Sequence, residues 1–200
     1  AQQGAQGRPL AGLEYLFDYP HGCIEQTTSP LLGALNVDSY YRNTPSPSYT
    51  DDDQDRVQGN VQSGVTRLAP GGGAGQHANG AWSMWGNDAE GDVFYTAYAL
   101  YGTGSVAIDP VLGSQSELDT IDFDASVVWL ADKQSADGRI PNDKAYFRDD
   151  YAMTGFTLLA IEKGGPYNAT ATDAATDIRA NATQFLLENQ HAAGYWQTGG

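Results

Sequence analysis

The sequence predicts an all-α protein built from repeated helix pairs, and two observations indicate this class. Apolar residues recur at helical spacing in several segments, as in Val57 to Leu68. In addition, a helix, a glycine turn with an aromatic residue and a further helix follow one another in a unit that returns roughly every fifty residues. Helix pairs of this kind can close into an α/α toroid, in which inner helices pack together and outer helices cover them.

The chain divides into a short leader and one domain. Residues 1–9 have neither a basic start nor an apolar core and are expected to form a flexible leader. Residues 10–200 suit a single domain with a sizeable core. Inside it, Leu10 to Phe17 has apolar residues at helical spacing. A second, short helix is expected at Leu31 to Leu35, because Pro30 should interrupt the turn that precedes it.

An acidic cluster, Asp51 to Asp55, precedes the helical segment Val57 to Leu68. Such a cluster can bind calcium, but this one lacks the ligand spacing and the glycine of a calcium loop. Acidic residues are also favourable at a helix N-terminus, where the dipole is positive. We therefore expect the cluster to cap a helix and face solvent. The glycine-rich stretch Pro70 to Gly75 should form a loop.

The repeated unit follows this loop. Its first turn contains Gly80, Ala81 and Trp82 and leads to a helix around Thr96 to Leu100. The second unit runs from Val127–Leu130 through Gln134 and Gly138 to Met153–Leu159, and the third runs from Phe185–Leu187 through Gln190 to Gly194, Tyr195 and Trp196.

The charge of the chain limits its partners. With 25 acidic and 10 basic residues, the formal net charge is −15, which argues against nucleic acid and anionic membrane surfaces because phosphate binding requires a basic face. No apolar run reaches the ~18 residues of a membrane span. The acidic residues are mainly Asp, and lysine occurs only at Lys133, Lys144 and Lys163. That composition fits a halophilic protein, whose self-repulsion salt would screen, and equally an ordinary acidic extracellular domain.

The only cysteine, Cys23, lies in the most informative stretch, residues 19–29. Gly22 punctuates the chain before it, and the residues after it can form the first turn of a helix. On that turn Cys23 and Gln26 lie three residues apart on one face, so the sulfur and the carboxamide can meet where free N–H groups favour negative charge. The sulfur could attack the carboxamide, expel ammonia and leave an internal thioester. The alternative is a buried, inert cysteine at a helix start.

Gly22 to Gln26, GCIEQ, resembles the thioester motif Gly-Cys-x-Glu-Gln of the alpha-2-macroglobulin and complement family, and the flanking residues of the stretch 19–29 resemble its bacterial branch. The resemblance extends from about Leu10 to the C-terminus and is most specific near Cys23 and in Trp82 to Leu100. It implies an α/α toroid. Since the toroid of the family is usually longer than this chain, we expect either an incomplete ring or a fragment of a larger protein.

Two neighbours of Cys23 are further candidates for the site. Glu25 projects from a different face of the turn and either positions it or is a solvated acid. His21 is close enough to act as a proton acceptor. In complement-like relatives a histidine from a later loop directs transfer to hydroxyls, but the matching stretch here, Arg139 to Arg148, contains no His. Its Tyr146 is a candidate pocket residue or a packing residue. This difference favours direct attack by amines.

The resemblance implies a covalent-capture domain that acts in an extracellular, cell-surface or periplasmic setting. Cys23 and Gln26 would form the thioester, and the acyl group would pass to amines of a trapped protease or a target surface. Each molecule would react once, so the domain would not be a turnover enzyme. We expect it to need no cofactor or metal and to work beside other domains of the same parent chain.

Three other functions stay open at this point. The glycine and aromatic repeats also suit an α/α toroid enzyme of the terpene-cyclase or prenyltransferase type, which would need an acidic cluster such as Asp51 to Asp55. A cysteine-nucleophile enzyme could pair Cys23 with His21, His77 or His191. An inert structural module is the fourth reading of the motif. A separate question concerns a set of aromatic residues that either shield a thioester from water or simply form core: Trp82, Trp85, Phe94, Tyr95 and Tyr98.

Overall fold

Helices account for all the regular secondary structure in the part of the chain that the computed structural model describes, which comprises residues 22–44, 49–86, 90–141 and 149–197. They are α2 (Ile24–Asn43), α3 (Asp51–Leu68), α4 (Val93–Ala107), α5 (Phe123–Ala131), α6 (Asp150–Gly164) and α7 (Ala169–Glu188), with a short 3-10 helix at Leu118–Thr120. The predicted all-α class is confirmed. The expected leader 1–9 and the expected helix at Leu10 to Phe17 lie outside the described residues.

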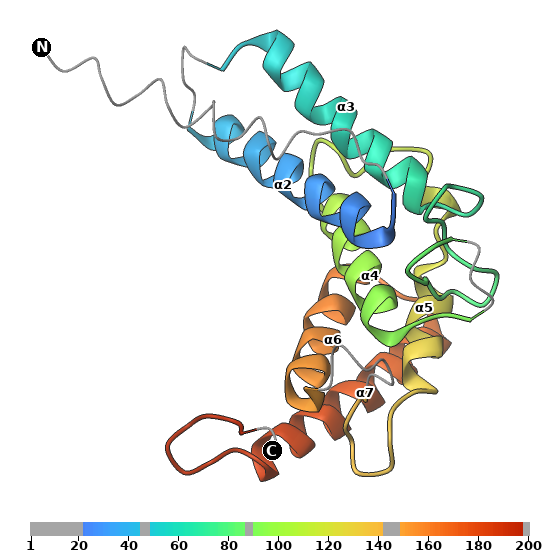
Figure 1. Ribbon diagram of the computed structural model, residues 1–200, viewed down its shortest axis with the longest axis vertical. Helices are drawn as coiled ribbons and strands as arrows, with labels where there is room; N and C mark the ends of the chain where they lie inside the picture. The colour runs from blue at the N-terminus through green and yellow to red at the C-terminus, as the bar shows by residue number, and fades with distance from the viewer. Residues whose placement is uncertain (1–21, 45–48, 87–89, 142–148, 198–200) are drawn as a thin grey trace, which may run out of the picture.

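The helices form two rows, as expected for an α/α toroid. Helices α2, α4 and α6 pack in succession, with α4 in contact with both of the others (Figure 1). Helix α3 packs along α2, while α5 packs against α4 and α7 and α7 also contacts α6. The chain therefore alternates between an inner row, α2, α4 and α6, and an outer row, α3, α5 and α7.

Two apolar clusters hold the rows together, and α4 contributes to both. One cluster joins α2 and α3 to the first glycine turn, with Ile24, Leu31 and Leu68 in its centre. The other joins α4, α5, α6 and α7, with Leu100 and Met153 fully buried. Burying a side chain of this size contributes about 1.5–3 kcal/mol. The N-terminal end of α2, which includes Ile24, is thus fixed by packing, and the candidate site lies at this end.

The three glycine turns share one hydrogen-bonding scheme, which explains the repeat seen in the sequence. In each, a glutamine side-chain amide donates to the carbonyl of a glycine four residues later, and that glycine has a positive φ of 85–90° that L-residues rarely adopt. The donor–acceptor distances are 3.1 Å for Gln76 and Gly80, 2.9 Å for Gln134 and Gly138, and 3.2 Å for Gln190 and Gly194.

The first two turns also pack against the helix that follows them in the outer row. A Cβ on Gly80 would lie 2.4 Å from the backbone of Ala125 in α5, and one on Gly138 would lie 2.2 Å from the carbonyl oxygen of Asn181 in α7. A Cβ on Gly194 would meet nothing within 4 Å. Glycine is therefore required twice for close approach and at the third turn for φ alone.

The short helix at Leu31 to Leu35 is wrong in extent, because α2 runs without a break through Pro30. Proline cannot donate a hydrogen bond to the Gln26 carbonyl, but Ile24 and Leu31 are buried on either side and their packing outweighs that loss. The acidic cluster does begin a helix: Thr50 is the N-cap of α3 and forms a capping box with Asp53.

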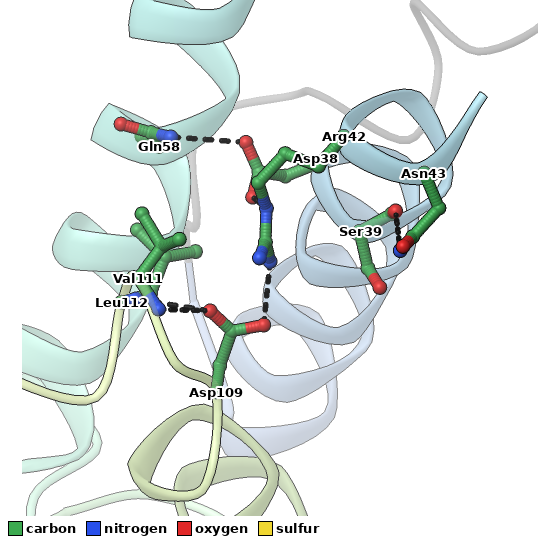
Figure 2. A network of polar contacts seen from close by, with 8 residues as sticks. All are labelled: Asp38, Ser39, Arg42, Asn43, Gln58, Asp109, Val111 and Leu112. Atoms are coloured by element: carbon green, nitrogen blue, oxygen red, sulfur yellow. Dashed lines mark hydrogen bonds and ion pairs between the residues drawn. The ribbon is translucent and has the colours of Figure 1, made fainter. Parts of the chain in front are cut away.

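The far end of α2 is fixed by a polar network (Figure 2). Asp38 is fully buried and accepts hydrogen bonds from the Arg42 Nε at 2.6 Å and from Gln58 of α3 at 3.0 Å. Arg42 also donates to Asp109, which follows α4, at 2.6 Å. These contacts join α2, α3 and the end of α4, so they set the direction of α2 from the end opposite to Cys23.

Asp109 is held as a carboxylate in this network. Burial alone would raise its pKa, but the backbone N–H groups of Leu112 and Val111 and the Arg42 guanidinium outweigh it, and the pKa of Asp109 lies below its ordinary value. The network consequently contributes stability that depends on pH.

Candidate functional site

Cys23 is the N-cap of α2, and its thiol is buried, with 5% of the residue exposed. The other five α-helices that the structure describes begin with an oxygen-bearing side chain that accepts the N–H three residues later. These N-caps are Thr50, Asp92, Asp122, Asp149 and Asn168. Cys23 places a sulfur where the other α-helices in the described part of the chain place a strong acceptor, which indicates a requirement other than helix capping.

The Gln26 side chain folds back over the start of α2. Its Oε1 accepts a hydrogen bond from the Cys23 backbone N–H at 3.2 Å. The backbone N–H of Gln26 faces the Cys23 side chain in turn, which completes a capping box, but this second contact does not have the geometry of a hydrogen bond. The two residues are therefore in contact through the carboxamide oxygen and a backbone donor, and the bond between sulfur and carboxamide stays a prediction.

Gly22 makes room for this arrangement. Its φ of 80° lies in the left-handed region, and a Cβ there would lie 2.0 Å from the Oε1 of Gln26. Any larger residue would occupy the position of the carboxamide oxygen. The sequence identifies Gly22 as a turn residue and as the first residue of GCIEQ. The room that it leaves depends on the conformation of the Gln26 side chain, which the residue pattern does not reveal.

The segment after the first glycine turn lies against the same end of α2, the dark-blue end in Figure 1. The Ile24 N–H donates to the Met84 carbonyl at 3.1 Å. Trp82 anchors this segment, because its indole is fully buried and donates to the Leu68 carbonyl at 2.9 Å. The part of the sequence that most resembles the macroglobulin family outside GCIEQ thus contacts the turn that carries Cys23.

The aromatic residues of this region divide into two groups. Trp82 and Tyr95 are buried members of the core, in agreement with the simpler of the two interpretations. Trp85 is 47% exposed. Phe94 and Tyr98 are half-buried and stack on each other with ring centroids 5.7 Å apart.

Tyr98 also reaches α2 directly. Its hydroxyl lies 2.7 Å from the hydroxyl of Ser29, which is three residues beyond Gln26. Residues three apart on a helix share a face. The Tyr98 ring therefore stands beside the face of α2 that carries the carboxamide.

Arg67 is part of the site, and sequence reasoning missed it. Its Nη2 donates to the Gly22 carbonyl at 3.0 Å, and its Nε lies 3.5 Å from the Thr27 hydroxyl. Thr27 in turn donates to the Cys23 carbonyl at 3.0 Å. In the sequence, Arg67 looks like an ordinary basic residue at the C-terminal end of a helix, where it lies in the last turn of α3. It is 45 residues away from Gly22, so no local pattern indicates that the two residues meet.

Of the remaining candidates, Glu25 lies on this turn, whereas His77 and His191 make their described contacts elsewhere. Glu25 is exposed at the surface of the first turn. His77 is hydrogen-bonded to Ser83 at 2.9 Å, and Ser83 itself donates to the Trp85 carbonyl. His191 stacks on Tyr195 in the third glycine turn. His21, Tyr146 and most of the stretch Arg139 to Arg148 lie outside the described residues.

Within residues 22–44, 49–86, 90–141 and 149–197, no group of three or more His, Cys, Asp or Glu side chains is placed to hold a metal ion. No helix in those ranges is both long and apolar enough to cross a bilayer.

The fold and the site define a class: a domain of paired helices that presents a cysteine thiol and a glutamine carboxamide at one helix N-terminus. A family model described as the A-macroglobulin TED domain matches residues 4–198, nearly the whole chain. The chain belongs to this family and is a macroglobulin-like thioester domain in the general sense. The resemblance read from GCIEQ is thereby confirmed.

Proposed function

We propose that Cys23 and Gln26 join in an internal thioester, and that the domain uses it once to acylate a nucleophile on a protease or another target surface. The observation that carries this proposal is the paired contact at the start of α2, in which the Gln26 Oε1 lies 3.2 Å from the Cys23 nitrogen. Membership of the thioester-domain family supports it.

The bond would form by acyl transfer within the turn. The Cys23 Sγ attacks the side-chain carbonyl carbon of Gln26, and the electron pair of the C=O bond moves onto Oε1. The Cys23 N–H stabilises that charge, as an oxyanion-hole donor does. The C–N bond then breaks, and the amide nitrogen leaves as ammonia with the thiol proton. Oε1 stays as the carbonyl oxygen of the thioester.

The same donor would act when the bond opens. An amine attacks the carbonyl carbon, charge develops again on Oε1, and the C–S bond breaks to leave an amide at Gln26. The proton lost by the amine ends on the Cys23 thiol. Because the amide is stable and the ammonia is gone, the cycle does not return to its start. The domain is thus a single-use acyl donor of the endopeptidase-inhibitor type rather than an enzyme.

The burial pattern suits a stored acyl group. Cys23 and Ile24 are buried, whereas Gln26 is exposed. The sulfur is protected by this domain, and the carbonyl face is open to a reacting partner. An acyl–sulfur bond lasts only where water is excluded, so we infer that another domain of the same parent chain covers that face until activation. Membership of the thioester-domain family supports an extracellular, cell-surface or periplasmic setting.

Amines are the expected acceptors. A hydroxyl is a poor nucleophile near neutral pH, and a positioned base contributes about 10²–10⁴-fold. The stretch Arg139 to Arg148 contains no His to act as that base. After activation, methylamine should therefore be incorporated well and glycerol poorly when the two compete, with amine incorporation rising with pH. Preferential ester formation would show that a base operates, and His21 would be the first residue to replace.

The proposal is tested by removing each partner separately. Cys23→Ala and Gln26→Ala should each abolish covalent capture of a protease while leaving the helices in place. Gln62→Ala is a matched control, because Gln62 is an exposed glutamine on α3, and it should capture as the unaltered protein does. Adducts formed through Cys23 in the Gln26→Ala variant would contradict the proposal and favour a cysteine-nucleophile enzyme.

The toroid-enzyme alternative receives less support from the geometry. It would need the cluster Asp51 to Asp55 to face a reaction chamber. Asp53 instead accepts from the Thr50 N–H and hydroxyl in the capping box of α3, and these hydrogen bonds hold its pKa below the ordinary value. Its carboxylate therefore already serves the helix start.

A further inference from the structure

Gly22 and Cys23 share a peptide group whose two ends make different contacts. Its C=O accepts from the Arg67 guanidinium at 3.0 Å. Its N–H donates to the Oε1 of Gln26 at 3.2 Å. Because a peptide group is planar and its C=O and N–H point in opposite directions, fixing one end also directs the other. A chain of two hydrogen bonds thus runs from the guanidinium through one peptide to the carboxamide oxygen.

We propose that Arg67 is a positioning residue for the acyl group: it holds and polarises the Gly22–Cys23 peptide so that the Cys23 N–H can stabilise charge on the Gln26 Oε1. This inference rests on the thioester proposed above and adds a residue from another helix to its chemistry. The contact that carries this role is the hydrogen bond from the Arg67 Nη2 to the Gly22 carbonyl.

The glycine-rich loop after α3 is shaped to hold the Arg67 side chain. A Cβ on Gly73 would lie 3.1 Å from both terminal nitrogens of the guanidinium, so the loop backbone passes directly beside it. The Ala74 N–H donates to the Arg67 carbonyl at 3.1 Å, and a Cβ on Gly72 would lie 2.3 Å from the same oxygen. The run of glycines between Pro70 and Gly75 therefore has a physical explanation: it lets the loop wrap closely around Arg67.

The local backbone depends on the same contact. Gly22 has the left-handed conformation that leaves room for Oε1. Arg67 binds the carbonyl of this residue, and its Nε approaches Thr27, which caps the Cys23 carbonyl. One side chain thereby contacts residues on both sides of Cys23.

The size of the effect follows from its indirect route. Removing a direct oxyanion donor slows a reaction by about 10²–10³-fold, and polarisation along a hydrogen-bond chain changes the strength of a bond by about 10–30%. The indirect effect is taken as about 10–30% of the free energy of the direct effect. Removing the guanidinium should then slow the incorporation of methylamine by about 2–8-fold. A lysine keeps the charge but not the forked donor, so it should recover part of the loss.

The test compares Arg67→Gln, Arg67→Lys and the control Arg56→Gln in otherwise unaltered protein. Arg56 lies on the same helix and pairs with Asp53 at 3.2 Å, away from the Cys23 turn. Three quantities are measured: the rate constant for methylamine incorporation by intact mass, the chemical shift of the Cys23 amide proton, and the thermal midpoint. We expect slower incorporation and an upfield amide shift for Arg67→Gln, intermediate values for Arg67→Lys, and no change for Arg56→Gln.

Two results would overturn the inference. One is incorporation at the unaltered rate in Arg67→Gln. The other is a slower rate that follows the thermal midpoint alone, with the amide shift unchanged and no recovery in Arg67→Lys, because that pattern reports a purely structural residue. If the unaltered protein incorporates no methylamine and has lost no ammonia, the thioester proposal itself fails. The amide shift then still shows whether Arg67 directs the Cys23 N–H.

Discussion

Replacing Gly22 by alanine would place a methyl group 2.0 Å from the Oε1 of Gln26, at a residue whose φ is 80°. The carboxamide is the end of a flexible side chain, so it would rotate away rather than force the backbone apart. The variant should therefore keep the helices and lose the one side-chain conformation in which the Gln26 carbonyl rests on the Cys23 N–H.

The cost in stability has two parts. An L-residue in the left-handed region costs about 1–2 kcal/mol, and the lost hydrogen bond from Cys23 to Gln26 adds about 0.5–1.5 kcal/mol. We expect Gly22→Ala to lower the free energy of unfolding by about 1.5–3.5 kcal/mol in total. The fraction of protein that forms the thioester should fall strongly, because the Gln26 carbonyl group is no longer held at the Cys23 N–H.

Gly71→Ala is the matched control. Gly71 has a φ of 83°, and a Cβ there would meet nothing within 4 Å. It should lose only the conformational part, about 1–2 kcal/mol, and should form the thioester normally. Urea unfolding measures the free energies, and intact mass measures the loss of ammonia. Equal unfolding free energies for the two variants, or a normal ammonia loss in Gly22→Ala, would refute the reasoning.

Three further predictions concern the scaffold. Gly80→Ala should lower the free energy of unfolding by about 2–5 kcal/mol, because its Cβ would lie 2.4 Å from the Ala125 backbone. Gly194 has the same φ but open space around a Cβ, so Gly194→Ala should lose only about 1–2 kcal/mol. Equal losses in urea unfolding would contradict the packing described. The pKa of Asp109 is lowered in the folded state, so its contribution to the free energy of unfolding is complete above the ordinary pKa of ~3.9 and is lost as the pH falls through the folded value. Asp109→Asn should therefore lose less stability on acidification than the unaltered protein. An unchanged dependence of the free energy of unfolding on pH would argue against this assignment. Burial, and then the charge of nearby carboxylates, raises the pKa of Tyr49 to about 12, so the free energy of unfolding should fall as the pH rises from ~10 towards that value. The Tyr49 hydroxyl has no hydrogen-bond partner among the described residues, so Tyr49→Phe should remove this alkaline loss and add about 1 kcal/mol at neutral pH. A destabilised variant would count against this assignment.

Local rules were sufficient for much of the fold and for the contact between the two central residues of the candidate site. Helical spacing located Val57 to Leu68, and the i, i+3 rule brought Cys23 and Gln26 together, because both depend on a few adjacent residues. Pro30 was misjudged for the opposite reason: its effect on α2 is decided by the burial of its neighbours. Tertiary packing outweighs a local preference of this kind.

The rest of the site depends on contacts between distant segments. Arg67 meets Gly22 across 45 positions, and nothing in the spacing of either residue indicates that meeting. The sequence shows glutamines in the second and third turns, but the matching role of Gln76 and its hydrogen bond to Gly80 could be assigned only from the geometry. Gly22 illustrates both cases, since the sequence predicts its turn and the structure adds its contact with Oε1.

The mass of the full-length gene product, before and after methylamine treatment, tests the central claim most directly. The thioester predicts a mass lower than that of the sequence by one ammonia, followed by addition of one methylamine at Gln26 and release of a titratable Cys23 thiol. A mass equal to that of the unmodified sequence, with Cys23 freely alkylated and Gln26 unchanged by methylamine, would contradict the account.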